Sequence, residues 1–194
     1  MIDYIPEKIS NPEILDVTSA WNTIPKIIDD LLTRFNISRN VALEFGVERG
    51  FSTYVLANYF KRVIGVDPFD WILDDKVSRD YYDVLKLLRE CNNIQLIQSR
   101  FEEFIKHDIF EMYDLIHIDI GYDTHAYDIT YPAGEWAASH SNCILFHDTI
   151  SFPEITTACE ELAVKYNFEF YNYREDIGDA GLVCGLGILI KKRW

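Results

Sequence analysis

One stretch organises this chain: Val41-Ala-Leu-Glu-Phe-Gly-Val-Glu-Arg-Gly-Phe-Ser-Thr-Tyr-Val-Leu-Ala-Asn-Tyr-Phe-Lys-Arg-Val-Ile-Gly-Val-Asp67. The apolar run 41–45 predicts a buried strand. Gly46 and Gly50 bracket a turn in which the backbone must adopt positive φ angles or approach a ligand closely. Residues 63–66 predict a second buried strand that leads into Asp67. This order of strand, glycine turn, helix, strand and acid predicts a doubly wound α/β fold.

The helix between the two strands should begin near the turn, because Ser52 and Thr53 are good capping residues, and should end at Lys61 and Arg62. Such a helix start presents N–H groups and a partial positive charge, which favours an anionic group beside it. An acid at the tip of the second strand grips ribose hydroxyls in doubly wound folds, so Asp67 predicts a nucleoside ligand. The alternative is a tight turn that binds nothing, but glycines, cap and acid together favour a cofactor.

The spacing Glu44-x-Gly46-x-x-x-Gly50-x-Ser52 is not the G-x-G-x-x-G of dinucleotide-binding proteins. It resembles the glycine motif of the class I S-adenosylmethionine-dependent methyltransferases. The resemblance implies that Glu44, Gly46, Gly50 and Ser52 surround the methionine half of the cofactor, with Asp67 on the ribose. It also implies a Rossmann-like, mostly parallel seven-stranded sheet of order 3-2-1-4-5-7-6 with an antiparallel last strand.

The rest of the chain supplies the remaining elements of such a fold. Apolar runs predict strands over 94–97, 112–119, 142–146, 168–171 and 184–190, and periodic patterns predict helices over 20–35, 78–90 and 153–166. A helix over 127–139 should be broken or shortened, because Pro132 and Gly134 are poor in a helix interior. We expect one domain, 1–194, in which residues 1–40 form an arm and a covering helix and 41–194 form the cofactor-binding core.

Composition excludes several classes of protein. The 194 residues carry a net charge of −14, which argues against a nucleic-acid-coating surface and favours small neutral or cationic substrates. The four cysteines follow no metal or redox spacing and are expected to be buried thiols. No stretch has the length of a signal peptide or a membrane span, so a cytoplasmic protein is expected, without a membrane partner.

The end of the third strand departs from the resembling family. Gln98, Ser99 and Arg100 stand where relatives carry a small residue and then an acid that reaches the adenine amine. Gln98 or Ser99 could replace that acid through its amide or hydroxyl group. Phe69 and Trp71 could flank the adenine or simply pack beneath the loop.

Two later passages resemble the metal-dependent O-methyltransferase branch of this family. Asp119 ends the fourth strand and is followed, after an insertion over 120–124, by His125, while Phe146-His147-Asp148-Thr149 ends the fifth strand. In the family's strand order Asp119 and Asp148 lie at neighbouring strand tips, where they could share a Mg²⁺ ion that acidifies an acceptor hydroxyl. Alternatively, Asp148 caps the following loop and Asp119 hydrogen-bonds nearby amides.

The predicted function follows from these motifs. We expect S-adenosylmethionine-dependent O-methylation of a small molecule or sugar, with Asp119 also near the cofactor and with His125 or His147 as the base. His117, between two isoleucines, is expected to be a packed histidine. The alternative is a catalytically inactive methyltransferase-like protein that serves as a binding or partner subunit, and the chain could form a homodimer.

Overall fold

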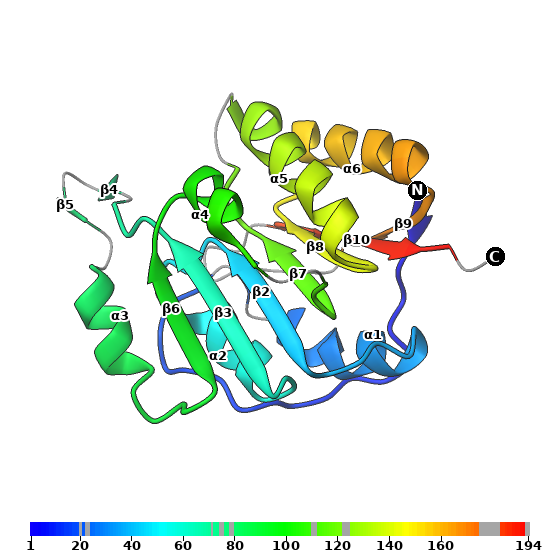
Figure 1. Cartoon of the computed structure of the whole chain (residues 1–194). Coiled ribbons are helices and arrows are strands. Elements are labelled where there is room, and N and C mark those ends of the chain that lie inside the picture. The colour runs from blue at the N-terminus through cyan, green and yellow to red at the C-terminus, as the bar shows by residue number, and fades with distance from the viewer. Residues whose placement is uncertain are drawn as a thin grey trace.

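The chain folds into an eight-stranded sheet of order β1-β9-β10-β8-β7-β2-β3-β6 in a computed structural model (Figure 1). The structure describes residues 1–19, 21, 24–70, 72–73, 76–77, 80–109, 112–121, 125–174 and 183–192. The strands of this sheet are β1 (Ile2–Asp3), β2 (Val41–Phe45), β3 (Arg62–Asp67), β6 (Ile94–Gln98), β7 (Leu115–Ile118), β8 (Cys143–His147), β9 (Phe168–Tyr173) and β10 (Leu186–Lys191). A separate short hairpin pairs β4 (Ile72–Leu73) with β5 (Lys76–Val77).

The predicted strand order is confirmed. The seven strands from β2 onward lie in the order β6-β3-β2-β7-β8-β10-β9, which is the predicted 3-2-1-4-5-7-6. β10 runs antiparallel to both β8 and β9, whereas the other neighbours among the seven are parallel. The eighth strand was not predicted: the N-terminal arm begins with β1, which adds to the edge of β9 in parallel.

Helices cover both faces of the sheet (Figure 1). α4 (Phe101–His107), α5 (Ala126–His140) and α6 (Pro153–Tyr166) lie over one face. The 3-10 helix η1 (Ile24–Ile27), α1 (Ile28–Arg34) and α2 (Phe51–Ala57) lie over the other, and α3 (Tyr81–Leu87) stands beside β6. In the part of the chain that the structure describes, no helix is long and apolar enough to span a membrane.

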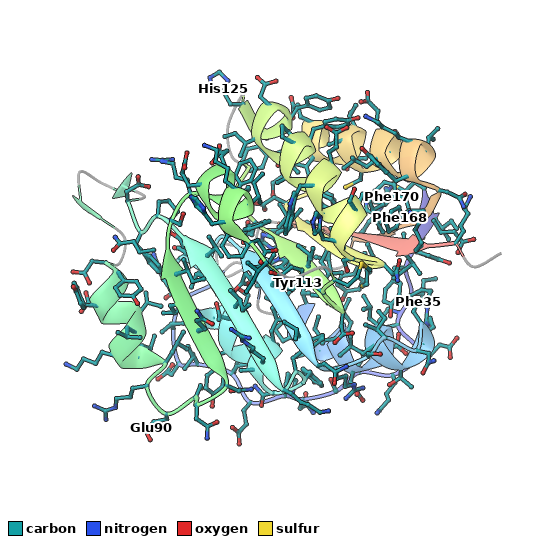
Figure 2. All side chains as sticks on the ribbon, viewed as in Figure 1. Phe35, Glu90, Tyr113, His125, Phe168 and Phe170 are labelled. Atoms are coloured by element: carbon teal, nitrogen blue, oxygen red, sulfur yellow. The ribbon has the colours of Figure 1, made fainter. Side chains whose placement is uncertain are left out.

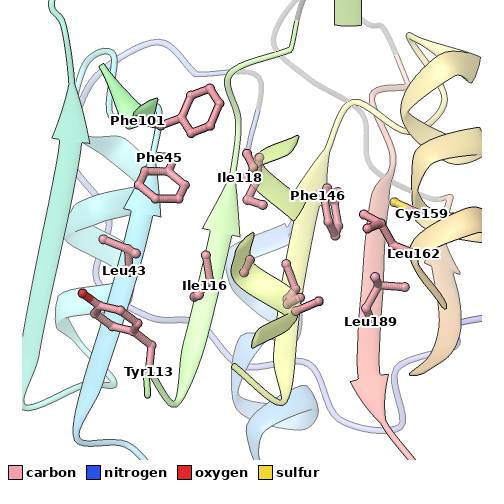
Figure 3. Close-up of a cluster of buried hydrophobic side chains, with 14 of the residues drawn as sticks. Leu43, Phe45, Phe101, Tyr113, Ile116, Ile118, Phe146, Cys159, Leu162 and Leu189 are labelled. Atoms are coloured by element: carbon pink, nitrogen blue, oxygen red, sulfur yellow. The ribbon is translucent and has the colours of Figure 1, made fainter. Parts of the chain in front are cut away.

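The alternation of side chains along the strands explains the two layers. Leu43, Phe45, Ile116, Ile118 and Phe146 point toward α5 and α6 and belong to one buried cluster (Figure 3). Their neighbours in the sequence, including Ala42, Leu115 and Leu145, belong to the cluster that packs against η1, α1 and α2. Both faces of the strands are therefore buried, as expected of a parallel sheet in an α/β protein.

The prediction of a broken helix at Pro132 was wrong. α5 is a continuous helix of 15 residues with Pro132 inside it. Packing explains the glycine two positions on, because a Cβ at Gly134 would lie 2.5 Å from Leu162 Cδ1 and 2.9 Å from Phe146 Cζ. Close contact of α5 with α6 and β8 thus outweighs the poor helix propensity of these two residues.

The first turn of α2 also differs from the prediction. Gly50 is the N-cap, with a φ of 81°, and no side chain caps the helix. Ser52 and Thr53 lie inside the first turn, and the Thr53 hydroxyl donates instead to the buried Glu44 carboxylate. The helix ends at Ala57 rather than at Lys61 and Arg62, and Arg62 begins β3.

Candidate functional site

A cavity of about 320 Å³ opens at the carboxyl ends of the central strands, and its size is that of a small-molecule site. Its walls come from the arm before η1, the turn between β2 and α2, and the segments that follow β3, β6, β7 and β8. The lining residues are Ser19, Trp21, Gly46, Val47, Glu48, Arg49, Phe51, Ser52, Asp67, Pro68, Phe69, Asp70, Arg100, Phe101, Glu102, Asp119, Ile120, Gly121, Ile129, His147 and Asp148.

The glycine turn forms one wall, and the fold explains why its first glycine is needed. Gly46 and Gly50 have φ angles of 91° and 81°. A Cβ at Gly46 would lie only 1.9 Å from the Asp119 carbonyl oxygen, so the turn passes directly against the segment after β7. A Cβ at Gly50 would meet two side chains of the α3 region, Leu88 Cδ1 at 3.0 Å and Val84 Cγ1 at 3.2 Å. The turn therefore brings the predicted cofactor loop beside Asp119.

Asp67 ends β3 and holds this turn in place. Its Oδ2 accepts hydrogen bonds from the N–H groups of Val47 at 2.8 Å and Glu48 at 2.9 Å, and its Oδ1 accepts one from Phe69 N–H at 2.5 Å. Burial raises the pKa of Asp67, and the three N–H groups counteract part of that rise. Since a carboxylate oxygen can accept two hydrogen bonds, Oδ1 can accept one more, and Asp67 lines the cavity.

Glu44 lies deeper than expected and does not line the cavity. Its side chain is fully buried; it accepts a hydrogen bond from Thr53 on α2 and pairs through Oε1 with His117 Nδ1 at 2.9 Å. The pairing follows from the register, because Glu44 and His117 are partners on adjacent strands. The indole of Trp21 stacks on the His117 ring at 4.6 Å and shields this cluster.

Trp21 is a cavity residue that the sequence did not identify. It is only 2% exposed, and its Nε1 has no hydrogen-bond partner among the described residues. The indole also meets the His147 ring edge-on at 6.3 Å. Because Trp21 belongs to the arm before η1, only the fold could place it beside the strand ends.

His147 joins the two acids at the strand tips. Its Nδ1 lies 3.4 Å from Asp119 Oδ1 and 3.6 Å from Asp148 Oδ2, and the imidazole is buried. Asp148 adopts a left-handed φ of 62° in the turn after β8. Burial alone would raise the pKa of Asp119, but the neighbouring imidazoles of His147 and His117 hold it below its usual value. This cluster can orient a group and accept its proton.

Other predicted site residues lie elsewhere. The His125 side chain is 70% exposed at the start of α5, 3.8 Å from Asp128, and does not line the cavity (Figure 2). Gln98 is exposed and donates to the Pro68 carbonyl, and Ser99 donates to the Arg100 carbonyl; neither lines the cavity. Trp71 and residues 122–124 lie outside the described residues.

Arg100 occupies the wall that Gln98 and Ser99 were expected to form. Its guanidinium pairs with Asp70, and both residues line the cavity. Phe69 lines the same region and packs edge-on against Tyr81, so its ring forms part of the wall and also packs beneath the loop. Six carboxylates and two guanidinium groups line the whole cavity, which is therefore predominantly acidic.

Comparison with known structures identifies the fold. An O-methyltransferase from Bacillus cereus in complex with SAH is 17% identical, has a TM-score of 0.65 and is matched over 91% of this chain and 83% of its own. A putative O-methyltransferase from Klebsiella pneumoniae is 14% identical, has a TM-score of 0.64 and is matched over 92% of this chain and 82% of its own. The chain has the class I S-adenosylmethionine-dependent methyltransferase fold.

Further matches have the same fold but differ in their substrates. The O-methyltransferase TomG from Streptomyces achromogenes, in complex with SAM, is 16% identical with a TM-score of 0.61, over 84% of this chain and 77% of its own. Other matched structures are described as a putative RNA methyltransferase and an rRNA methylase. No protein-family model and no curated protein sequence matches the chain. The fold therefore leaves the acceptor to be inferred from the site.

Proposed function

We propose that this chain is an S-adenosylmethionine-dependent methyltransferase that methylates a hydroxyl oxygen of a small molecule or sugar. The observation that carries the proposal is the cavity at the carboxyl strand ends, which brings Gly46, Asp67, Asp119 and His147 together. This is where ligands bind in doubly wound folds. An acidic cavity and a chain with a net charge of −14 suit a cationic cofactor and a small acceptor better than RNA.

The described residues fit the proposed cofactor. Asp67 would offer its remaining acceptor position to a ribose hydroxyl, and Ser52, in the first turn of α2, also lines the cavity. The cofactor would supply a methyl group already activated on a sulfonium sulfur. Glu44, which is fully buried and hydrogen-bonded to Thr53 and His117, would act by holding the turn rather than by touching the cofactor.

The protein then has to align the acceptor and remove one proton. We assign the second task to the His147 imidazole, which would take the hydroxyl proton as the methyl group moves to oxygen. Asp119, 3.4 Å from His147 Nδ1, would orient the ring and stabilise its charged form. General-base catalysis of this kind contributes about 10²–10⁴-fold. The exposed His125 is outside this arrangement.

Magnesium does not fit the donors present. His147 Nδ1 lies 3.4 Å from Asp119 Oδ1 and 3.6 Å from Asp148 Oδ2, so the donor set around the two carboxylates includes an imidazole nitrogen. Magnesium requires near-octahedral oxygen coordination and is poorly suited to such a set. The proposed proton transfer therefore uses the imidazole and no magnesium ion.

Calorimetry with S-adenosylmethionine and S-adenosylhomocysteine tests cofactor binding. We expect wild type to bind and Asp67→Ala to weaken binding by about 1.5–3 kcal/mol, the value of a hydrogen bond to a charged group. Gln98→Ala is the matched control, because Gln98 does not line the cavity. A folded wild-type protein that binds neither compound would favour the alternative, a catalytically inactive partner subunit.

Turnover tests the proton acceptor. With catechols and simple sugars as candidate acceptors, His147→Gln should lower kcat by about 10²-fold or more and remove the acidic limb of the pH–rate profile. His125→Gln should leave both unchanged. Equal rates in wild type and His147→Gln would assign proton removal to solvent or to another group.

A further inference from the structure

Two residues of the cavity wall, together with a cysteine that does not line the cavity, form a group of potential metal ligands. His147, Asp148 and Cys184 each offer one metal-ligand atom, and these three atoms all lie within 4.8 Å of one another. This cluster was not predicted, because Cys184 is far from the other two residues along the chain and its spacing matches no metal motif.

Strand pairing brings the cysteine to this point. Leu186, the first residue of β10, pairs with His147, the last residue of β8. The N–H of Ile150 donates to the Cys184 carbonyl at 2.8 Å. A Cβ at Gly185 would lie 2.7 Å from Thr149 Oγ1, so the segment before β10 packs tightly against the turn after β8. The backbone thus holds the thiol beside the imidazole and the carboxylate.

The three donors differ in their access to the cavity. His147 and Cys184 are only 3% and 4% exposed, whereas Asp148 is half-buried. His147 and Asp148 line the cavity and Cys184 does not. The Cys184 sulfur would therefore bind an ion from the side away from the cavity. A fourth coordination position would remain open toward the cavity, as in catalytic zinc sites with three protein ligands. Asp119, 3.4 Å from His147 Nδ1, is a further carboxylate at this position.

We propose that His147, Asp148 and Cys184 bind a divalent transition-metal ion of the zinc type. Thiolate, imidazole and carboxylate are the ligands that zinc and cobalt(II) accept together, whereas magnesium and calcium prefer oxygen alone. Binding converts the Cys184 thiol to a thiolate and releases its proton to solvent. The ion would also take the imidazole lone pair, so the proton transfer assigned to His147 belongs to the metal-free protein. Metal binding needs no methyl donor, and its test is independent of the proposed function.

Cobalt(II) is the direct probe, because its spectrum reports the ligands. Titration of the full chain, without S-adenosylmethionine, should give one cobalt ion per chain and a near-ultraviolet charge-transfer band from the thiolate. Zinc should displace cobalt and abolish the band, and excess magnesium should not. Cys184→Ser should lose the band, while Cys91→Ser should keep it, since Cys91 lies before β6 at the opposite end of the sheet.

A second variant makes the result independent of how Cys184→Ser folds. Asp148→Asn should bind cobalt about 10–100-fold more weakly or worse, because losing a residue that only hydrogen-bonds a metal ligand already weakens binding that much. At saturation this variant should still show the charge-transfer band, because Cys184 is intact. Cobalt bound without a charge-transfer band, the same band in a folded Cys184→Ser protein, or no cobalt binding by folded wild type would each overturn the proposal.

Discussion

Replacement of Glu44 separates a structural role from direct contact with the cofactor. The carboxylate is fully buried and accepts from Thr53, and its Oε1 pairs with His117 Nδ1 at 2.9 Å. Glu44→Ala removes the partner of both groups. The His117 Nε2 atom already lacks a hydrogen-bond partner within the described part of the chain, so the variant would leave that ring with no hydrogen bond.

The loss of stability expected for Glu44→Ala can be estimated from its two hydrogen bonds. Each hydrogen bond to a charged group is worth about 1.5–3 kcal/mol, and removing one member of a buried pair costs about 3–5 kcal/mol. Because the two bonds share one carboxylate, their effects should not add fully. We expect Glu44→Ala to lower the free energy of unfolding by about 3–5 kcal/mol. At about 2–4 °C per kcal/mol for a domain of this size, Tm should fall by about 6–20 °C.

Glu44→Gln is the matched variant. Its amide oxygen can accept from His117, and its NH₂ group can donate to the Thr53 hydroxyl, so both hydrogen bonds can persist. We expect a loss below about 1.5 kcal/mol in urea unfolding and an affinity for S-adenosylmethionine within about threefold of wild type. A Tm for Glu44→Ala within about 2 °C of wild type would refute the structural role. A folded Glu44→Gln protein with at least about tenfold weaker cofactor binding would show that Glu44 touches the cofactor after all.

Three further predictions concern the cavity walls. Burial raises the pKa of Asp67, so the folded state binds that proton more tightly than the unfolded state. Wild type should therefore lose stability relative to Asp67→Asn as the pH rises above the ordinary pKa of an aspartate. Urea unfolding midpoints of the two proteins at successive pH values test this prediction. Gly46→Ala combines a positive φ with a Cβ only 1.9 Å from the Asp119 carbonyl oxygen and should cost about 3–5 kcal/mol. Gly50→Ala also has a positive φ but meets only side-chain atoms, of Leu88 and Val84 at 3.0 Å or more, and should cost about 1–3 kcal/mol in thermal melts. Trp21→Ala should destabilise by about 3–5 kcal/mol, and Trp21→Phe by clearly less, because phenylalanine retains a ring over His117; equal losses would mean that the stack contributes little.

Local pattern was sufficient for most of the fold. The apolar run over 41–45 and the acid at 67 predicted β2 and β3, and the resemblance carried by the glycine turn gave the strand order that the structure confirms. Strands that are buried on both faces appear in the sequence as continuous apolar runs, so their positions can be predicted without the tertiary structure. The same clarity placed Asp67, Asp119 and His147 at strand ends, where the cavity lies.

Local pattern was misleading wherever packing outweighed propensity. Pro132 predicted a break, yet α5 is continuous, because its contacts with α6 and β8 outweigh the local cost. Thr53 was predicted to cap the helix, but its hydroxyl donates a hydrogen bond to the buried Glu44 carboxylate, and Gly50 is the N-cap. A capping preference is worth about 1 kcal/mol, which a buried charged acceptor can exceed.

The sequence by itself therefore determined the order of the elements and the acids at the strand tips, since both depend on residues close together in the chain. Only the tertiary structure decided which side chains share a site. Pairing of β2 with β7 buried Glu44 against His117, and pairing of β8 with β10 brought Cys184 to His147 and Asp148. The arm placed Trp21 on the cavity wall, and the course of α5 left His125 in solvent. These contacts join residues distant in sequence, and their geometry is set by sheet register and helix packing, which no local spacing encodes.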